Sequence, residues 1–370
     1  MFRVRLTPLI LVLLVGGACQ LRAQSSISLS VDLRDAPRKL LHTTEILPVQ
    51  PGPFTLAFPE WIRNEHVPAP LTQQVGLFIK ARDGSGVVGQ ALSWKRDPLD
   101  PYLYHVATPN GVRSIEVRFD FITSDKNGDA GASSDANIAV LDWNTVVLYP
   151  YSGPDTRVAN LTVTPTVILP SGWHTATSLK TVAGAMEPTS SIVNFQPVSL
   201  EQLVDSPMIA GRYFREIALA PEVSPRHYLD IVADHPEDLE VPQARVDELS
   251  QAIRQAGLLF RSHHYDEYRF LITLSNNISG AAIDHHQSLD NRRRANFFHN
   301  EKYANYTIHD FLHSWNGKYR RFEGLATPNF QTPVITSGMW VYEGLTDYLS
   351  NVMTVRIGSE TKEEILDILA

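Results

Sequence analysis

The chain has 370 residues, a length that predicts two or three domains with room for buried cores. Its hydrophobic content of 43% and charged content of 19% are ordinary for a globular protein and exclude global disorder. A formal net charge of -8 makes nucleic acid an unsuitable partner, and the basic triplet Arg292–Arg294 is interpreted as a solvated surface turn.

Residues 1–23 have the pattern of a secretory signal peptide. A basic start with Arg3 and Arg5 precedes a short apolar run from Leu9 to Val15, followed by small residues. This run is far shorter than the ~20 residues that cross a bilayer, and no other segment comes close, so no integral membrane segment is expected. The pattern predicts a secreted or periplasmic protein.

Two processing sites compete in this segment. Cleavage after Ala23 releases a soluble chain, whereas Cys19 is the attachment site if the protein is an outer-membrane lipoprotein. Gly16 stands where lipoprotein sites favour Leu, so soluble release is preferred over a lipid anchor at Cys19. Because Cys19 is the only cysteine, no disulfide forms within the chain and stability must come from packing.

Residues 25–204 are predicted to form an all-β, sandwich-like N-terminal domain. Short runs rich in Val, Ile, Phe and Thr alternate with Gly, Pro, Asn and Asp, as in domains of many short strands. In the run 114–122, alternate residues from Ile115 to Phe121 fall on one face of a strand. The predicted strand-forming runs are 74–81, 114–122, 137–151, 159–169 and 190–198.

From residue 205 the pattern changes to α+β, with the boundary expected near residues 200–210. The segment 241–260 predicts a helix that begins near Pro242, and 268–274 predicts a strand. Further helices are expected over 303–317 and around 340–353. The helix in 241–260 is expected to bury one stripe formed by Val246, Leu249, Ile253 and Leu258.

The end of the sequence has its own signals. Thr361 and Glu364 have the spacing of a capping box and predict the start of another helix. The sequence stops at Ala370 without a helix-ending Gly or Pro, so the chain is interpreted as interrupted. A truncated piece of a longer protein is therefore one alternative.

His309 and His313 are four residues apart in the predicted helix over 303–317. This spacing puts both imidazoles on one face, where together they can bind one zinc ion. The pair is weak evidence by itself, because 13 histidines in a chain of this length give roughly 0.5 such pairs by chance. The apolar residues around them predict a helix that is buried enough to hold a dry site.

A second pair, Glu343 and Asp347, has the same spacing on the next predicted helix. Glu343 supplies a third metal ligand in this hypothesis, and Asp347 accepts the far N–H of a ligating imidazole and orients it. The alternative is a solvated acidic face. Aromatic and aliphatic neighbours favour the metal site, because they leave little solvated face: Trp340, Tyr342, Leu345, Tyr348 and Leu349.

Together these segments resemble the glycyl aminopeptidases, metallopeptidase family sixty-one. The motif of that family, H-E-F-F-H-x-W-N, is followed by a Glu in W-V-x-E-G-x-T-x-Y. This sequence has HDFLHSWN and WVYEGLTDY, and His313 precedes Glu343 by 30 residues as in the family. Upstream, NTVVLYPY, LPSGWHTATSL and LEQLVDSPMIAG are also similar, so the resemblance covers most of the mature chain.

The resemblance implies a β-domain, a thermolysin-like (gluzincin) catalytic domain and usually a PDZ domain. The catalytic domain, residues 205–370, is expected to be C-terminally incomplete with no PDZ domain, so a transition-state-stabilising residue stays unassigned. The family further implies Zn²⁺ as cofactor and a peptide or protein substrate with N-terminal Gly or Ala.

The family also carries a G-G-L-E-H strand motif, whose Glu holds the free amine of the substrate in related aminopeptidases. This sequence has GAAIDHHQS, in which Asp284 and His285 match in kind while Ala281 and Ala282 replace the glycines. Asp284 and His285 are therefore expected at a substrate-binding edge. The alternative places His285 and His286 on a surface turn after a strand.

Asp310 stands where the family has the Glu that acts as general base. An Asp carboxylate falls short by about one C–C bond, ~1.5 Å, of a zinc-activated water that a Glu would reach. We therefore expect an intact zinc site with Asp310 as a weakened base. The leading hypothesis is a secreted zinc aminopeptidase, and the alternatives are a catalytically impaired zinc-binding pseudo-peptidase or a truncated fragment that binds peptides.

Overall fold

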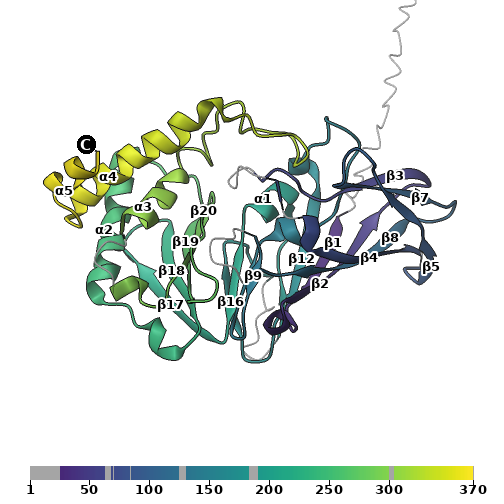
Figure 1. Ribbon diagram of the computed structural model, residues 1–370, viewed down its shortest axis with the longest axis horizontal. Coiled ribbons are helices and arrows are strands. Elements are labelled where there is room, and N and C mark those ends of the chain that lie inside the picture. The colour runs from purple at the N-terminus through teal and green to yellow at the C-terminus, as the bar shows by residue number, and fades with distance from the viewer. Residues whose placement is uncertain are drawn as a thin grey trace, which may run out of the picture.

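The polypeptide forms a β-rich region and a mixed α/β region that lie side by side in an elongated molecule (Figure 1). The expected signal peptide, including Cys19 and Ala23, lies outside the described residues. Among the helices that are described, none combines the length and the apolar character of a membrane span. The computed structural model describes residues 26–62, 68–69, 71–83, 85–124, 131–182, 191–299 and 304–369.

Three sheets build the β-rich region, which confirms the predicted β-rich N-terminal part. The largest sheet has the order β14 (Ile192–Asn194), β12 (Thr162–Ile168), β1 (Ile27–Asp32), β2 (Leu40–Pro48), β8 (Ser114–Ile122), β4 (Gln74–Arg82), β5 (Val88–Leu92), with β15 (Val198–Ser199) also paired to β12. A second sheet has the order β11 (Tyr149–Pro150), β3 (Gly52–Ala57), β7 (Leu103–Thr108), β6 (Trp94–Arg96). The third has the order β13 (His174–Thr177), β16 (Met208–Gly211), β10 (Ile138–Leu141), β9 (Ser133–Ser134).

Strand β8 shows why the alternating pattern gives a strand here. Ile115, Val117, Phe119 and Phe121 are buried, and the strand pairs with β2 on one side and β4 on the other. The predicted run 137–151 is not one strand, because a short helical turn separates β10 from β11. Short helices connect the strands of this region: α1 (Leu200–Val204) and 3-10 turns at Ala36–Arg38, Leu71–Gln73, Trp143–Thr145 and Val158–Asn160.

A five-stranded mixed sheet organises the α/β region, in the order β17 (Tyr213–Leu219), β18 (Arg226–Ala233), β19 (Glu267–Leu274), β21 (Ser288–Arg293), β20 (Ala282–Asp284). The three central strands are parallel, and the two outer strands are antiparallel to their neighbours. The helices are α2 (Gln243–Phe260), α3 (Ala304–His313), α4 (Leu345–Ile357) and α5 (Lys362–Leu369), with 3-10 turns at Pro236–Leu239, Phe297–His299 and Thr336–Gly338.

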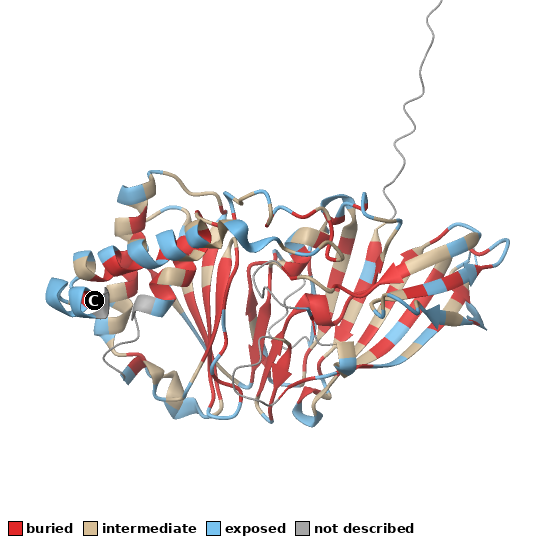
Figure 2. Ribbon diagram, turned by 45° about the horizontal axis from the view of Figure 1, so that its top comes forward, coloured by how far each residue is buried: buried red, intermediate tan, exposed pale blue. Residues whose placement is uncertain are grey.

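The mixed sheet is buried on both faces. Phe270 and Ile272 of β19 join a core with the helices, whereas Leu271 between them joins a second core with Ile138 and Ile209 of the small sheet β13-β16-β10-β9. Figure 2 shows the resulting continuity of buried residues where the two regions meet. Burial on both faces explains why β19 is apolar without alternation.

Helix α2 departs from its predicted stripe at one position. Leu249 and Ile253 are buried as predicted, together with Ala252 and Ala256. Leu258, predicted as a member of the same stripe, is 64% exposed. It follows Leu249 by nine residues, and at ~3.6 residues per turn this places it about half a turn away, on the opposite side of the helix.

The prediction of a solvated turn at Arg292–Arg294 is wrong for Arg292. This side chain is fully buried in β21 and its guanidinium donates to Asp142 Oδ2 (2.8 Å) and Asp290 Oδ2 (2.7 Å). It also donates to the Gly131 carbonyl (2.6 Å), so it joins the mixed sheet to the β-rich region. The carboxylate partners on both sides make burial of this cation tolerable.

The change from the third sheet to the mixed sheet falls at Arg212, between β16 and β17. Strand β16 pairs with β10 and β13, so residues 208–211 pack as part of the β-rich region. The junction expected near residues 200–210 therefore includes helix α1 and strand β16.

Glu45 is a buried carboxyl group in β2. Its Oε1 accepts a hydrogen bond from the backbone N–H of Leu148 (2.7 Å), and its Oε2 has no hydrogen-bond partner among the described residues. Burial raises the pKa of Glu45 well above its ordinary value, although the Leu148 hydrogen bond acts in the opposite direction. The folded protein therefore keeps this group protonated over a pH range in which the unfolded chain ionises it.

Replacing Glu45 with glutamine is expected to stabilise the fold increasingly as pH rises. Above about pH 4.5 the unfolded wild type loses the Glu45 proton and the folded protein keeps it, so its unfolding free energy falls by up to ~1.4 kcal/mol per pH unit from this group. Urea unfolding between about pH 5 and about pH 8 measures the difference. The exposed Glu240→Gln variant is the control, and a pH-independent difference for Glu45→Gln would contradict the account.

Candidate metal centre

Helix α3 presents His309 and His313 on one face and an apolar surface on the other. Ile308, Phe311 and Leu312 are buried in the core between the mixed sheet and the helices. This burial fixes the rotation of α3 about its axis. The two imidazole rings are therefore side by side, with centroids 4.5 Å apart. The helix predicted over 303–317 is described over Ala304–His313 and ends at the second histidine.

Trp315 and Asn316, directly after α3, fix the chain on both sides of the site. The Trp315 indole stacks on Phe260 of α2, with centroids 4.6 Å apart, and donates its N–H to the Ser262 carbonyl (2.8 Å). The Asn316 amide donates to the Val341 carbonyl (2.8 Å). Asn316 therefore ties the segment that carries Glu343 to the end of α3, and Trp315 ties the same end to α2.

Glu343 lies in a π-helical turn, Trp340–Gly344, directly before α4. The wider turn leaves backbone carbonyls to be satisfied by side chains, and π turns of this kind recur at functional sites. The Asn316 amide donates to the Val341 carbonyl, and the Thr346 hydroxyl donates to the Tyr342 carbonyl (2.7 Å). These bonds hold the turn that carries Glu343 against the end of α3.

The segment between Asn316 and the π turn runs to the β-rich region and back. Phe330 is buried in the core of that region, and its carbonyl accepts the backbone N–H of Trp61 (2.7 Å). The Asn329 amide donates to the Thr156 carbonyl (3.1 Å). The 30-residue spacing between His313 and Glu343 is thus occupied by a segment anchored outside the α/β region.

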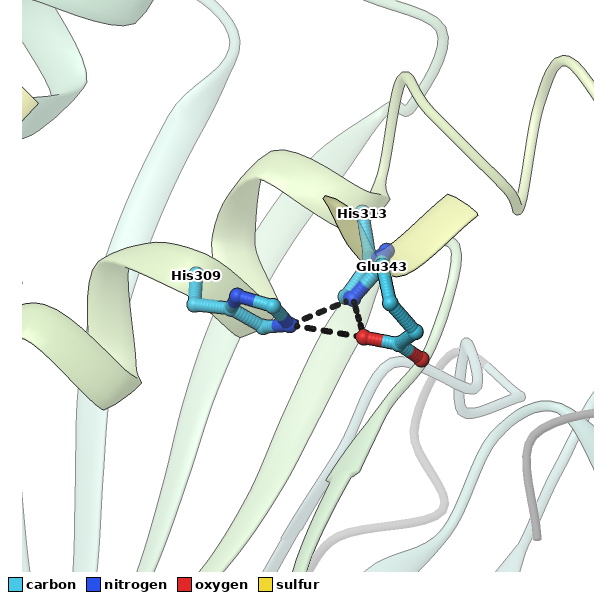
Figure 3. A group of neighbouring side chains, drawn as sticks. All are labelled: His309, His313 and Glu343. Atoms are coloured by element: carbon cyan, nitrogen blue, oxygen red, sulfur yellow. Dashed lines mark hydrogen bonds and ion pairs between the residues drawn. The ribbon is translucent and has the colours of Figure 1, made fainter. Parts of the chain in front are cut away.

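Three ligand atoms converge on one point (Figure 3). The Nε2 atoms of His309 and His313 are 2.8 Å apart, and Glu343 Oε2 is 3.2 Å and 3.4 Å from them. In a tetrahedral zinc site with bonds of ~2.0–2.1 Å, ligand atoms are ~3.3–3.4 Å apart. The group requires shifts of at most about half an ångström to fit zinc.

The hydrogen bonds behind the imidazoles determine which nitrogen faces this point. His313 Nδ1 is 3.0 Å from the Asn316 carbonyl, which can only accept, so this nitrogen donates. His309 Nδ1 is 3.0 Å from Asp347 Oδ1, which also accepts. In its neutral form, each imidazole then turns an Nε2 lone pair toward the same point, an arrangement that suits a shared cation.

The charges around the site also favour a cation. Burial lowers the pKa of His313, but the carboxylates of Asp284 and Glu343 outweigh it and raise the pKa to about 9. The carboxylates of Asp284 and Glu343 therefore make the surroundings of the His313 ring electronegative. A divalent metal ion bound to the three ligand atoms would supply the missing positive charge.

Asp310 is buried beside His309 on α3. Burial and then the nearby Asp284 carboxylate raise the pKa of Asp310 to about 6. Its Oδ2 has no hydrogen-bond partner among the residues that the structure describes. An unpaired buried carboxylate oxygen is costly in a purely structural role.

Asp284 is the last residue of β20, the edge strand of the mixed sheet, His285 follows it directly, and both are buried. Asp284 Oδ2 accepts the Tyr342 hydroxyl proton (2.6 Å). His285 Nδ1 is 3.3 Å from Asp205 Oδ1. The structure therefore brings Asp284 next to the metal group, and directs His285 toward the β-rich region. The exposed surface turn considered as an alternative for His285 is wrong.

Asp205 is a residue that the sequence did not single out. It also accepts the His286 backbone N–H (3.1 Å) and pairs with the Lys318 ammonium (2.6 Å). Burial raises the pKa of Asp205, but Lys318 and His285 outweigh it and hold the pKa below its ordinary value. Its partners come from two distant segments, residues 285–286 and Lys318, so no local pattern predicts them.

The expectation of little solvated face around Glu343 and Asp347 is wrong. Tyr342 is buried, but Trp340 is 77% exposed and Tyr348 is 59% exposed. The side of α4 that faces α3 and α2 is covered, whereas Trp340 and Tyr348 point away from this core. Asp347 itself is exposed while its Oδ1 contacts His309.

Replacing Asp347 with alanine is expected to weaken zinc binding about 10- to 100-fold. The loss follows because the His309 ring is no longer held by the carboxylate behind it. Competition with a zinc chelator measures the affinity. Asp367→Ala, an exposed acid on the neighbouring helix α5, is the control, and equal affinities for all three proteins would contradict a role for Asp347 in orienting His309.

Sequence comparison assigns two family domains to the chain. The Peptidase M61 N-terminal domain matches residues 28–212, and the M61 glycyl aminopeptidase domain matches residues 302–370. No curated protein matches the chain. The second match includes His309, His313 and Glu343.

Solved structures share the fold at low sequence identity. An aminopeptidase N family protein from Idiomarina loihiensis has a TM-score of 0.76 and 17% identity, and the match covers 92% of this chain and 56% of that chain. An M1 zinc metallopeptidase from Deinococcus radiodurans has a TM-score of 0.52 and 13% identity, with 91% and 71% covered. A mutant of that enzyme bound to a Tyr-Ser-Ala substrate has a TM-score of 0.54.

This chain thus spans little more than half of the Idiomarina loihiensis protein. The resemblance noted in the sequence is confirmed by both domain matches, in the expected order and with the candidate metal group in the second. The chain belongs to the M61 glycyl aminopeptidase family.

Proposed function

We propose that this protein is a zinc-dependent aminopeptidase that acts on peptides with a small N-terminal residue, glycine or alanine. The convergence of His309 Nε2, His313 Nε2 and Glu343 Oε2 on one point carries this proposal. Two imidazoles and one carboxylate are a donor set of catalytic zinc sites that keep one position open. When bound, zinc would polarise the scissile carbonyl and lower the pKa of the attacking water.

The residues of the chain then have separate roles in the proposed reaction. Asp310 takes the proton of the attacking water and passes it to the leaving amine. Its raised pKa, about 6, lies close to neutral pH, which suits a group that first accepts and then donates a proton. Asp347 and the Asn316 carbonyl hold the two imidazoles in orientation.

Asp284 is proposed to lie at the edge that receives the substrate, whereas His285, next to it in the chain, contacts Asp205. Asp284 ends the edge strand β20 and contributes to the raised pKa of His313, so a negative charge lies beside the metal group. The free ammonium of a peptide is its chemical complement. The Deinococcus radiodurans enzyme, similar in fold, is described with a bound tripeptide substrate, which supports a peptide as the ligand.

Hydrolysis of matched peptides tests the proposal. Purified protein with one equivalent of zinc is expected to cleave glycine- and alanine-initiated peptides, and to leave the N-acetylated forms intact. Removal of zinc with a chelator is expected to abolish cleavage, and added zinc to restore it. Cleavage that survives metal removal, or that ignores N-acetylation, would contradict the proposal.

A second candidate is a zinc-binding pseudo-peptidase. The shorter side chain of Asp310 favours it, because a carboxylate about 1 Å out of place can cost on the order of a hundredfold in rate. Such a protein would bind zinc and peptides without cleaving them. The substitution of Asp310 with glutamate, treated in the Discussion, separates the two candidates.

We further propose that the mature protein is secreted or periplasmic, on the signal-peptide pattern of residues 1–23. The mass of the mature chain tests this directly. A chain that begins after Ala23 supports release, a lipidated chain that begins at Cys19 would instead indicate an outer-membrane lipoprotein, and an uncleaved chain would contradict both.

A further inference from the structure

Tyr342 lies between the metal group and Asp284. It is buried in the π turn, immediately before Glu343. Its hydroxyl donates to Asp284 Oδ2 (2.6 Å), and its ring stacks on the His313 imidazole with centroids 4.3 Å apart and planes at 23°. One side chain therefore contacts both a candidate metal ligand and the candidate amine-binding carboxylate.

The surrounding chain is shaped to hold this ring. Gly317 has a φ of +115°, and a Cβ at this position would lie 1.8 Å from Tyr342 Cε2. Only glycine fits there, for its conformation and for the close approach of the ring. The backbone carbonyl of Tyr342 accepts the Thr346 hydroxyl proton (2.7 Å). Ring, hydroxyl and backbone are thus each fixed by a separate neighbour.

The hydroxyl of Tyr342 reaches the carboxylate of Asp284 although the aspartate side chain is short. Asp284 stands where the family motif has a longer Glu, and Tyr342 stands at a position that the motif leaves variable. A carboxylate has about four acceptor sites, so the same group can accept the Tyr342 hydroxyl and an ammonium group together. The bond fixes the position of one oxygen of this short carboxylate.

We propose that Tyr342 is a positioning residue for recognition of the substrate's free amine. Its hydroxyl holds the Asp284 carboxylate in the orientation that binds an ammonium, and its ring keeps His313 in place at the metal. The inference rests on the proposed aminopeptidase function. It differs from a purely structural role, in which the hydroxyl only satisfies a buried carboxylate and has no effect on ligand choice.

Binding of triglycine and N-acetyl-triglycine tests this inference without relying on turnover. All proteins carry Asp310→Asn, which removes the proposed base and keeps the peptide intact, and are loaded with zinc. Tyr342→Phe, Asp284→Asn and their combination are compared with the parent by calorimetry. Tyr265→Phe is the matched control, because it also removes a buried hydroxyl, bonded to His227 (2.9 Å) and His263 (3.0 Å).

Tyr342→Phe is expected to weaken triglycine binding about tenfold, the loss typical of one charge-assisted hydrogen bond. N-acetyl-triglycine binding and zinc affinity are expected to stay unchanged, because the ring still stacks on His313. Combined with Asp284→Asn, the substitution is expected to add no further loss. Tyr265→Phe is expected to bind both peptides as the parent does.

Equal loss for both peptides, no loss for triglycine, or additive losses in the combined variant would each overturn the inference. A parent that shows no preference for the free amine would overturn it as well. Zinc binding and peptide cleavage by the wild type are measured separately. Their failure would reject the proposed function even if the effect of Tyr342→Phe on amine binding were found.

Discussion

Substitution of His313 with alanine is expected to lower zinc affinity by about a thousandfold and to abolish peptide cleavage. A zinc site bound with ~10–16 kcal/mol distributes this free energy over three or four ligand bonds, and ~4 kcal/mol corresponds to three decades in affinity. His313 is the buried member of the group, with its Nε2 2.8 Å from His309 Nε2. Chelator competition and metal analysis measure the loss.

The fold is expected to survive this substitution. The core that positions α3 is formed by Ile308, Phe311 and Leu312, which are unchanged. His174→Ala, an exposed histidine in the β-rich region, is the control and is expected to retain the wild-type affinity. Stoichiometric zinc in purified His313→Ala, with a correctly folded protein by circular dichroism, would show that the metal is bound elsewhere.

Extension of Asp310 to glutamate is expected to raise the rate of peptide cleavage about a hundredfold. The added methylene moves the carboxylate by ~1.5 Å, and a misplacement near 1 Å can cost on the order of a hundredfold. The Asp310 Oδ2 atom has no partner among the described residues, so lengthening the side chain breaks no hydrogen bond at this atom. The gain is expected in kcat, because the ligands that hold zinc are unchanged.

Two controls accompany this variant. Asp310→Asn, which cannot accept the proton, is expected to be inactive, and Asp367→Glu on helix α5 is expected to leave the rate unchanged. A thermal melt checks that the larger side chain is accommodated, since overpacking of a buried position typically costs ~1–3 kcal/mol. Zinc binding without cleavage in both the wild type and Asp310→Glu would favour the pseudo-peptidase.

Each pair of site residues could be predicted because it depends on a short spacing, whereas the joining of the two pairs was predicted from the family resemblance. His309 and His313 follow from one helical turn, and Glu343 with Asp347 from another, so local periodicity alone places each pair. The alternation in β8 and the capping box of α5 are of the same kind. In the structure Thr361 Oγ1 accepts the Glu364 backbone N–H (3.2 Å), and Glu364 in turn accepts the Thr361 N–H (2.8 Å).

The parts that could not be predicted depend on contacts between distant segments. Arg292 is buried because Asp142, 150 residues earlier, lies opposite it. Tyr342 meets Asp284 across 58 residues, and neither belongs to a repeating pattern. Exposure of Trp340 was mispredicted for the same reason, since an aromatic residue on a helix does not itself reveal which side another element covers.

Metal analysis of the wild-type chain tests the central claim most directly. After incubation with excess zinc and extensive dialysis, we expect one zinc ion per chain, lost in His313→Ala and retained in His174→Ala. A folded wild-type protein that retains no zinc would contradict the assignment of His309, His313 and Glu343 as a metal site, and with it the proposed function.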